Sequence, residues 1–123
     1  MDRINVGLIG LGTVGTGVAK ILLTRREFLA QRAGVPLVLK KICTRHTRRI
    51  RTVRIDPRLI TSRPDAILKD PEIDIVVELI GGIHPAKEYV LEAIEGGKSV
   101  VTANKALLAH EGDALFRAAD KAG

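Results

Sequence analysis

Three glycines near the start of the chain have the spacing of a phosphate-binding turn. Gly10, Gly12 and Gly15 fit the pattern G-x-G-x-x-G, with an apolar run before it and an amphipathic segment after it. The first glycine would allow the tight bend, the second the approach of a pyrophosphate and the third close packing of helix on strand. This context favours dinucleotide binding over a turn used only for packing. The candidate cofactor-binding residues here are Gly10, Leu11, Gly12, Thr13, Val14 and Gly15.

A second chemical signal follows the second expected strand, where the adenosine ribose of a dinucleotide would lie. Sites that prefer NAD place an acid there to bind the ribose 2′-hydroxyl, but the chain has no acid between Glu27 and Asp56. It has Thr44, Arg45 and His46 instead. The guanidinium of Arg45 can pair with a 2′-phosphate, which an acid would repel. The sequence therefore favours NADP(H), with NAD(H) as a possible cofactor, unless Arg45 is only a solvated loop residue.

Two later loops also carry residues suited to a ligand. Gly81 and Gly82 follow an apolar run and would let a ribose or nicotinamide approach the backbone, although packing explains them equally well. The next strand ends in a hydroxyl, an amide and an ammonium within the run Thr102, Ala103, Asn104 and Lys105. Because a cation is disfavoured at a helix N-terminus, the lysine in this run indicates a function.

The remaining reactive side chains give no comparable pattern. His46, His84 and His110 are scattered and have no matching cluster of acids or cysteines, so we expect no metal site. The single Cys43 cannot form an internal disulfide, and its place at a strand end is typical of a small buried hydrophobe.

Hydrophobic periodicity predicts the elements that must position these residues. Apolar runs predict strands over residues 4–9, 36–43, 74–80 and 99–102, and helical spacing predicts helices over 14–32, 85–95 and 105–121. We expect a helical turn at 65–69 and a loop over 44–63, which prolines interrupt. The alternation of strands and helices implies an α/β fold, a Rossmann-type doubly wound parallel sheet. Because the chain stops after a helix, we expect this sheet to be incomplete at the C-terminus.

Composition and charge narrow the class of protein. A chain of 123 residues with 46% hydrophobic residues and no Trp fits one domain with an aliphatic core, covering residues 1–123. It has no signal-peptide pattern and no apolar run long enough to span a bilayer, so we expect a cytoplasmic protein without a membrane partner. The charge of +6 comes from arginines between Thr44 and Arg63. These arginines lack interleaved aromatic residues, which disfavours RNA binding and leaves a solvated loop as the better interpretation.

Three segments together resemble homoserine dehydrogenase: residues 7–15 (GLIGLGTVG), 77–82 (VELIGG) and 100–109 (VVTANKALLA). The third is the most specific, and the resemblance covers almost the whole chain apart from the arginine-rich loop. It implies the N-terminal nucleotide-binding domain of an enzyme that interconverts L-aspartate 4-semialdehyde and L-homoserine with NAD(P)H. That reaction lies on the route to threonine, methionine and isoleucine.

The resemblance also implies roles for particular residues. Leu11, Thr13 and Val14 would contact the dinucleotide backbone, and Arg45 would meet the adenosine phosphate. Lys105 would reach the cofactor and the active-site region as a supporting catalytic residue, with Asn104 beside it. In that family the main catalytic lysine and the acids that hold homoserine lie in a later domain. We therefore expect this chain to be inactive alone, and the full enzyme to form a homo-oligomer through the absent domain.

Two rival functions stay open at this point. Another dehydrogenase of small substrates, such as an L-aspartate dehydrogenase, could have a similar first domain, and residues 102–105 are the feature that discriminates it. A stand-alone module that senses dinucleotide is favoured by the short length and disfavoured by the unfinished sheet.

Overall fold

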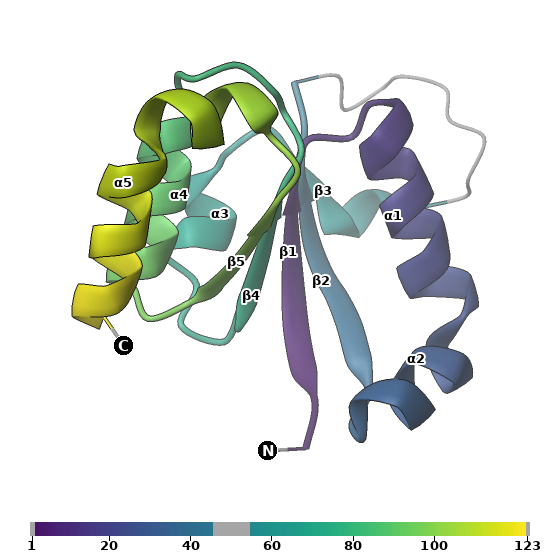
Figure 1. The fold of residues 1–123 in the computed structure, drawn as a ribbon. Helices are drawn as coiled ribbons and strands as arrows, with labels where there is room; N and C mark the ends of the chain where they lie inside the picture. The colour runs from purple at the N-terminus through teal and green to yellow at the C-terminus, as the bar shows by residue number, and fades with distance from the viewer. Residues whose placement is uncertain (1, 46–54, 123) are drawn as a thin grey trace.

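A parallel sheet of five strands forms the frame of the molecule (Figure 1). The computed structural model describes residues 2–45 and 55–122. Within them the strands run in the order β3-β2-β1-β4-β5. Their bounds are β1 (Ile4–Ile9), β2 (Leu37–Cys43), β3 (Ile60–Thr61), β4 (Ile75–Glu78) and β5 (Ser99–Thr102). The chain builds the sheet outward on one side of β1 and then crosses to the other, which confirms the expected doubly wound α/β fold.

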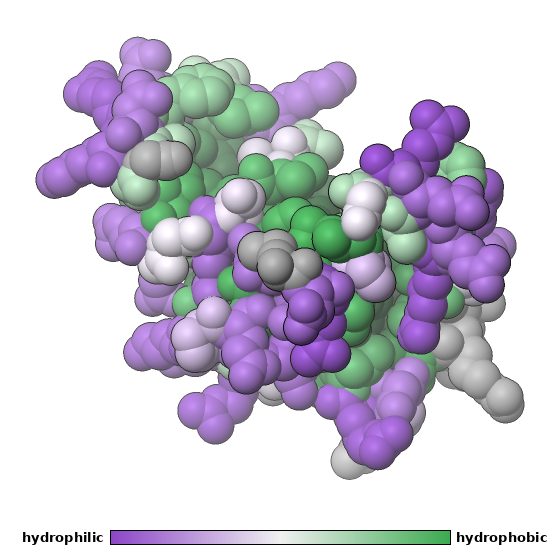
Figure 2. Space-filling model, turned by 90° about the horizontal axis from the view of Figure 1, so that it is seen from below, coloured by the Kyte–Doolittle hydropathy of each residue, from purple (hydrophilic) through white to green (hydrophobic). Residues whose placement is uncertain are grey.

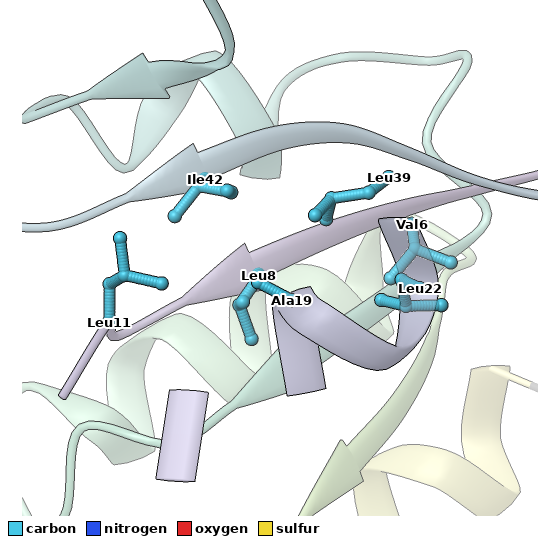
Figure 3. Close-up of a cluster of buried hydrophobic side chains, with 7 residues drawn as sticks. All are labelled: Val6, Leu8, Leu11, Ala19, Leu22, Leu39 and Ile42. Carbon is cyan, nitrogen blue, oxygen red and sulfur yellow. The ribbon is translucent and has the colours of Figure 1, made fainter. Parts of the chain in front are cut away.

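One face of the central strands packs against the first helices. Helix α1 (Thr13–Thr24) contributes to a buried cluster with β1 and β2, and α2 (Arg26–Ala33) follows it. Figure 3 shows the side chains of this cluster, which are Val6, Leu8, Leu11, Ala19, Leu22, Leu39 and Ile42. Leu11, from the glycine-rich turn itself, is only 4% exposed, so the turn is anchored in the core.

The other face of the sheet packs against the later helices, which are α3 (Asp65–Leu68), α4 (Ala86–Glu95) and α5 (Lys105–Ala122). Successive residues of a strand point to opposite faces, so Ile9 joins a second cluster with Ile67, Val76 and Ala93. Cys43 belongs to the same cluster, and burial raises the pKa of its thiol. Its expected role as a small buried hydrophobe is confirmed.

The outer strand β5 is covered on one face only. Val100 packs against the clusters formed with α4 and α5, whereas Val101 points the opposite way and is 55% exposed. Seen from the end at which the strands begin, hydrophilic side chains project around the rim and apolar side chains show between them (Figure 2). No described helix is long and apolar enough to cross a membrane.

The prediction of a single helix over residues 14–32 is wrong, because Arg25 separates two helices there. This residue leaves the helical region, with φ −116° and ψ 37°, between α1 and α2. The hydroxyl of Thr24 donates to the carbonyl of Lys20 at 2.6 Å, a contact that competes with regular helix geometry. The ring of Phe28 then lies 4.5 Å from the Arg25 guanidinium carbon, which stabilises the turn into α2.

Two other boundaries differ from the expectation. Part of the predicted loop 44–63 forms a 3-10 helix, η1 (Pro57–Leu59), and the two-residue strand β3. Residues 46–54 of that loop lie outside the described residues. Strand β4 ends at Glu78 and not at residue 80, because the Glu78 carboxylate accepts a hydrogen bond from the Ile80 N–H and turns the backbone away from the sheet. The other strands and helices begin and end within one residue of the expected bounds.

Candidate dinucleotide-binding site

Each of the three positions in the turn after β1 is occupied by glycine for a different structural reason. Gly10 has φ +105°, and a Cβ there would lie 2.9 Å from the backbone carbon of Leu79. A Cβ on Gly15 would overlap the carbonyl oxygen of Gly10. The fold itself therefore requires both. Around Gly12, in contrast, no described atom lies within 4 Å of an added Cβ, so this exposed residue leaves room for a ligand against the backbone.

The start of α1 is suited to an anion. Gly12 is its N-cap residue, no described side chain caps the helix, and its first turn contains no acid. Thr13 and Val14 are exposed there. The first N–H groups of a helix have no partner within the helix and carry a partial positive charge. A pyrophosphate lying over Gly12 would accept hydrogen bonds from these groups.

A hollow of about 230 Å³ extends from the turn to the end of β2. Its lining residues are Gly10, Leu11, Gly12, Thr44, Arg45, Leu79 and Ile80. The structure thus brings Arg45, which is exposed, to the same hollow as the glycine-rich turn. Whole ligand pockets are typically about 300–1,000 Å³, so the hollow suits one part of a dinucleotide, and the rest would extend beyond it.

The loops after β4 and β5 meet beside the turn. Gly81 and Gly82 have φ values of +78° and +71°, which favour glycine, and both are exposed. The side-chain amide of Asn104 donates to the carbonyl of Gly82, and its oxygen accepts from the Leu107 N–H at 3.1 Å. Asn104 therefore caps α5 and joins the two loops at once.

Glu78 is a site residue that sequence reasoning missed. It is the last residue of β4 and is 0% exposed. One carboxylate oxygen accepts from the Thr102 hydroxyl at 2.7 Å, and the other accepts from the N–H groups of Ile80 at 2.9 Å and Gly81 at 3.4 Å. The available signal was an acid inside an otherwise apolar run, three residues before Gly81.

Lys105 and Ala103 lie where the loop after β5 leads into α5. Both are exposed, and Lys105 is the first residue of α5. Within residues 2–45 and 55–122, the Lys105 ammonium has no hydrogen bond or ion pair, so it is available to a ligand.

The two described histidines, His84 and His110, have different surroundings. His84 pairs with Glu88 one helical turn away, at 2.6 Å, and this contact lowers the pKa of the Glu88 carboxyl. His110 is exposed on α5, and His46 lies outside the described residues. In the part of the chain that the structure describes, no three side chains of His, Cys, Asp or Glu gather as metal ligands would.

Known sequences of one kind match the chain. The family model described as "Homoserine dehydrogenase, NAD binding domain" matches residues 10–123. The homoserine dehydrogenase of Methylobacillus glycogenes is 50% identical over 109 residues, which make up 89% of this chain and 26% of that protein. The homoserine dehydrogenase of Bacillus subtilis is 38% identical over 123 residues, which cover 100% of this chain and 28% of the relative.

Solved structures agree with the sequence matches. The homoserine dehydrogenase from Thiobacillus denitrificans is 43% identical, with a TM-score of 0.85. The matched region makes up 98% of this chain and 28% of the Thiobacillus chain. The homoserine dehydrogenase of Staphylococcus aureus is 36% identical, with a TM-score of 0.91. The matched region makes up 100% of this chain and 31% of the Staphylococcus chain. The chain thus spans about a quarter to a third of the length of these relatives.

Proposed function

Since the chain belongs to the family of homoserine dehydrogenase NAD-binding domains, we propose that it binds NADP(H) in preference to NAD(H). Its role in the complete enzyme is to orient the nicotinamide for hydride transfer between L-aspartate 4-semialdehyde and L-homoserine. That reaction serves the biosynthesis of threonine, methionine and isoleucine. The names of the relatives favour this activity over that of an L-aspartate dehydrogenase.

One observation carries the cofactor preference. The described residues that line the hollow beside the glycine-rich turn include Arg45 and no acid. NAD-preferring sites use an acid to bind the free 2′-hydroxyl, whereas a 2′-phosphate needs a cation. Arg45 is exposed, so its guanidinium can turn towards a bound phosphate at little cost in desolvation.

The other residues divide between the two ends of the cofactor. We assign the pyrophosphate to Gly10, Gly12 and Gly15 and to the backbone of the residues between them, which are Leu11, Thr13 and Val14. We assign the nicotinamide half to the loops after β4 and β5, with the residues Gly81, Gly82, Thr102, Ala103, Asn104 and Lys105. The bound nicotinamide supplies the hydride chemistry, and the residues of this chain bind and orient it. We assign Lys105, which follows this loop at the start of α5, as a supporting catalytic residue.

The preference is tested by titrating NADPH and NADH into the chain and into Arg45→Ala. A charge-assisted hydrogen bond contributes about 1.5–3 kcal/mol, or roughly ten- to a hundredfold in affinity. We expect Arg45→Ala to lower the NADPH-to-NADH affinity ratio by about tenfold or more, mainly through weaker NADPH binding. All titrations are made at one salt concentration, because salt screens phosphate contacts.

Arg63→Ala is the matched control. Arg63 is an exposed arginine of the same segment, but it does not line the hollow. The control is expected to leave the ratio unchanged. If Arg45→Ala also leaves it unchanged, Arg45 is a solvated loop residue and does not select the cofactor.

A further inference from the structure

We infer that Glu78 is a positioning residue for the nicotinamide half of the cofactor. Through Thr102 and the N–H groups of Ile80 and Gly81, it holds the turn at Gly81–Gly82 in one conformation. The inference rests on the proposed dinucleotide function, and it assigns a task to a buried acid that no step of that function uses.

The burial of Glu78 needs a reason. An ionised carboxylate removed from water is costly unless hydrogen bonds replace its hydration. The three residues before it in β4 are Ile75, Val76 and Val77, so an apolar side chain would suit the strand equally well. Glu78 instead accepts three hydrogen bonds, which engage both of its oxygens. What an acid adds at this position is acceptors for the backbone of the glycine turn.

The hydrogen bonds of Glu78 continue into the neighbouring loop. Thr102 donates its hydroxyl hydrogen to Glu78, and the same oxygen accepts from the backbone N–H of Asn104 at 3.1 Å. Asn104 in turn donates to the carbonyl of Gly82. The turn is therefore held from both ends, at the N–H groups of Ile80 and Gly81 and at the carbonyl of Gly82.

This support matters because the turn has no side chains of its own to fix it. Gly81 and Gly82 are exposed, and no described atom lies within 4 Å of a Cβ added to either. Glycine also loses more conformational freedom on ordering than other residues. A network that orders the turn before the cofactor arrives lowers the entropy cost of binding the nicotinamide against it.

Among the described residues, the hollow proposed for the adenosine half meets this network at Ile80 alone. The hollow with Arg45 is lined by neither Thr102 nor Asn104. Changes at these two residues should therefore weaken contacts to the nicotinamide half and spare contacts to the adenosine half. This separation distinguishes a positioning role from a general contribution to folding.

The experiment titrates NADPH and adenosine 2′,5′-bisphosphate, which lacks the nicotinamide half, into the chain and its variants. Thr102→Val keeps the side-chain volume and removes the hydroxyl. We expect its NADPH affinity to fall by about tenfold, which corresponds to about 1.4 kcal/mol, with the bisphosphate affinity unchanged. Thr102→Ser retains the hydroxyl and is expected to recover most of the loss.

Asn104→Ser is the second variant, and it decides the matter if Thr102→Val does not fold. Serine retains an oxygen that can cap α5, but it is too short to reach the carbonyl of Gly82. We expect the same selective loss of NADPH affinity. The inference is overturned if both ligands weaken equally or if NADPH binding is unchanged in the folded variants. If the unaltered chain binds neither ligand, the dinucleotide function fails first and the inference falls with it.

Discussion

Gly12 and Gly15 stand three residues apart in one turn, but only Gly15 is required by the fold. A Cβ at Gly15 would overlap the carbonyl oxygen of Gly10, whereas a Cβ at Gly12 would meet open space. The sequence pattern treats the two glycines alike, since it records only their spacing. The structure separates a glycine kept for packing from one that leaves room for a ligand.

Gly12→Val should therefore weaken cofactor binding more than it destabilises the fold. Its side chain would occupy the space that we propose for the pyrophosphate, and we expect NADPH affinity to fall by more than about tenfold. The free energy of unfolding should fall by no more than about 1 kcal/mol, the typical cost of an unfavourable N-cap residue, because no described atom lies within 4 Å of the added Cβ. Binding is measured by titration and stability by urea denaturation of the same sample.

Two other glycines supply the controls for this prediction. Gly17 lies on α1 with open space around it, so Gly17→Val should preserve both binding and stability. Gly15→Ala should lower the free energy of unfolding by about 1–3 kcal/mol, the usual cost of forcing a group into filled space. Equal NADPH affinity in the unaltered chain and in folded Gly12→Val would remove the phosphate-binding role from this turn.

Glu78 shows where reading single residues from sequence reaches its limit. The glycines and Arg45 could be selected because their types and spacing carry meaning within a short segment. A lone acid in a strand carries none until its neighbour across the sheet is known. That neighbour is Thr102, whose strand position is paired with Glu78 in the parallel register of β4 and β5.

At the scale of elements, periodicity located the long strands and helices but not β3 or the division between α1 and α2. A strand of two residues contains no period, and β3 exists because Ile60 and Thr61 pair with the end of β2. The division at Arg25 depends on a hydroxyl bonding back to the preceding turn. Both features depend on specific contacts, which secondary-structure propensities do not describe.

A testable ion pair joins β2 to the segment that leads into β4. The ammonium of Lys40 lies 2.7 Å from Asp70 and 2.9 Å from Glu72. The hydrogen bond between Lys40 and Asp70 is the main cause that raises the pKa of Lys40 and lowers the pKa of Asp70. Lys40→Met should lower the free energy of unfolding near pH 7 by about 0.5–1 kcal/mol, since partly exposed pairs contribute little.

The stability difference between the unaltered chain and Lys40→Met should depend on pH, because the pKa of Asp70 is lowered and that of Lys40 is raised in the folded state. The pKa of Asp70 is lower in the folded state, so its contribution is present above the unfolded value of about 3.9 and is lost as the pH falls through the folded value. The pKa of Lys40 is higher in the folded state, so its contribution is present below about 10.4 and is lost as the pH rises through the folded value. Urea denaturation of the unaltered chain and of Lys40→Met, from acidic to alkaline pH, measures this stability difference.

Lys69→Met is the control for the ion pair. Lys69 lies 3.7 Å from Asp65 on one exposed helical turn, and the loss of this contact should have a smaller effect. Equal effects of the two substitutions, or a difference that does not change with pH, would contradict the proposed contribution of Lys40.

At the scale of the whole molecule, we expect this chain to bind the cofactor and turnover to require a longer enzyme. The chain spans 28% of the Bacillus subtilis homoserine dehydrogenase. We expect the chain to bind NADPH but not to oxidise it when L-aspartate 4-semialdehyde is added, whereas the Bacillus subtilis enzyme, assayed in parallel, does so. The absorbance of the reduced nicotinamide follows the reaction. Oxidation by this chain alone would show that it contains the full catalytic set.

The position of β1 also has a consequence for synthesis on the ribosome. Of the five described strands it is synthesised first, but it lies between β2 and β4, and the hydrogen bond from the Asn5 N–H to Asp74 spans 69 residues of sequence. At about 5–20 residues per second, β4 is completed roughly 3–14 s after β1. For that interval the nascent chain has an apolar strand with one unpaired edge, the kind of surface that pairs with other chains. The speed of translation between residues 9 and 78 therefore sets how long each new molecule is open to aggregation before its sheet can close.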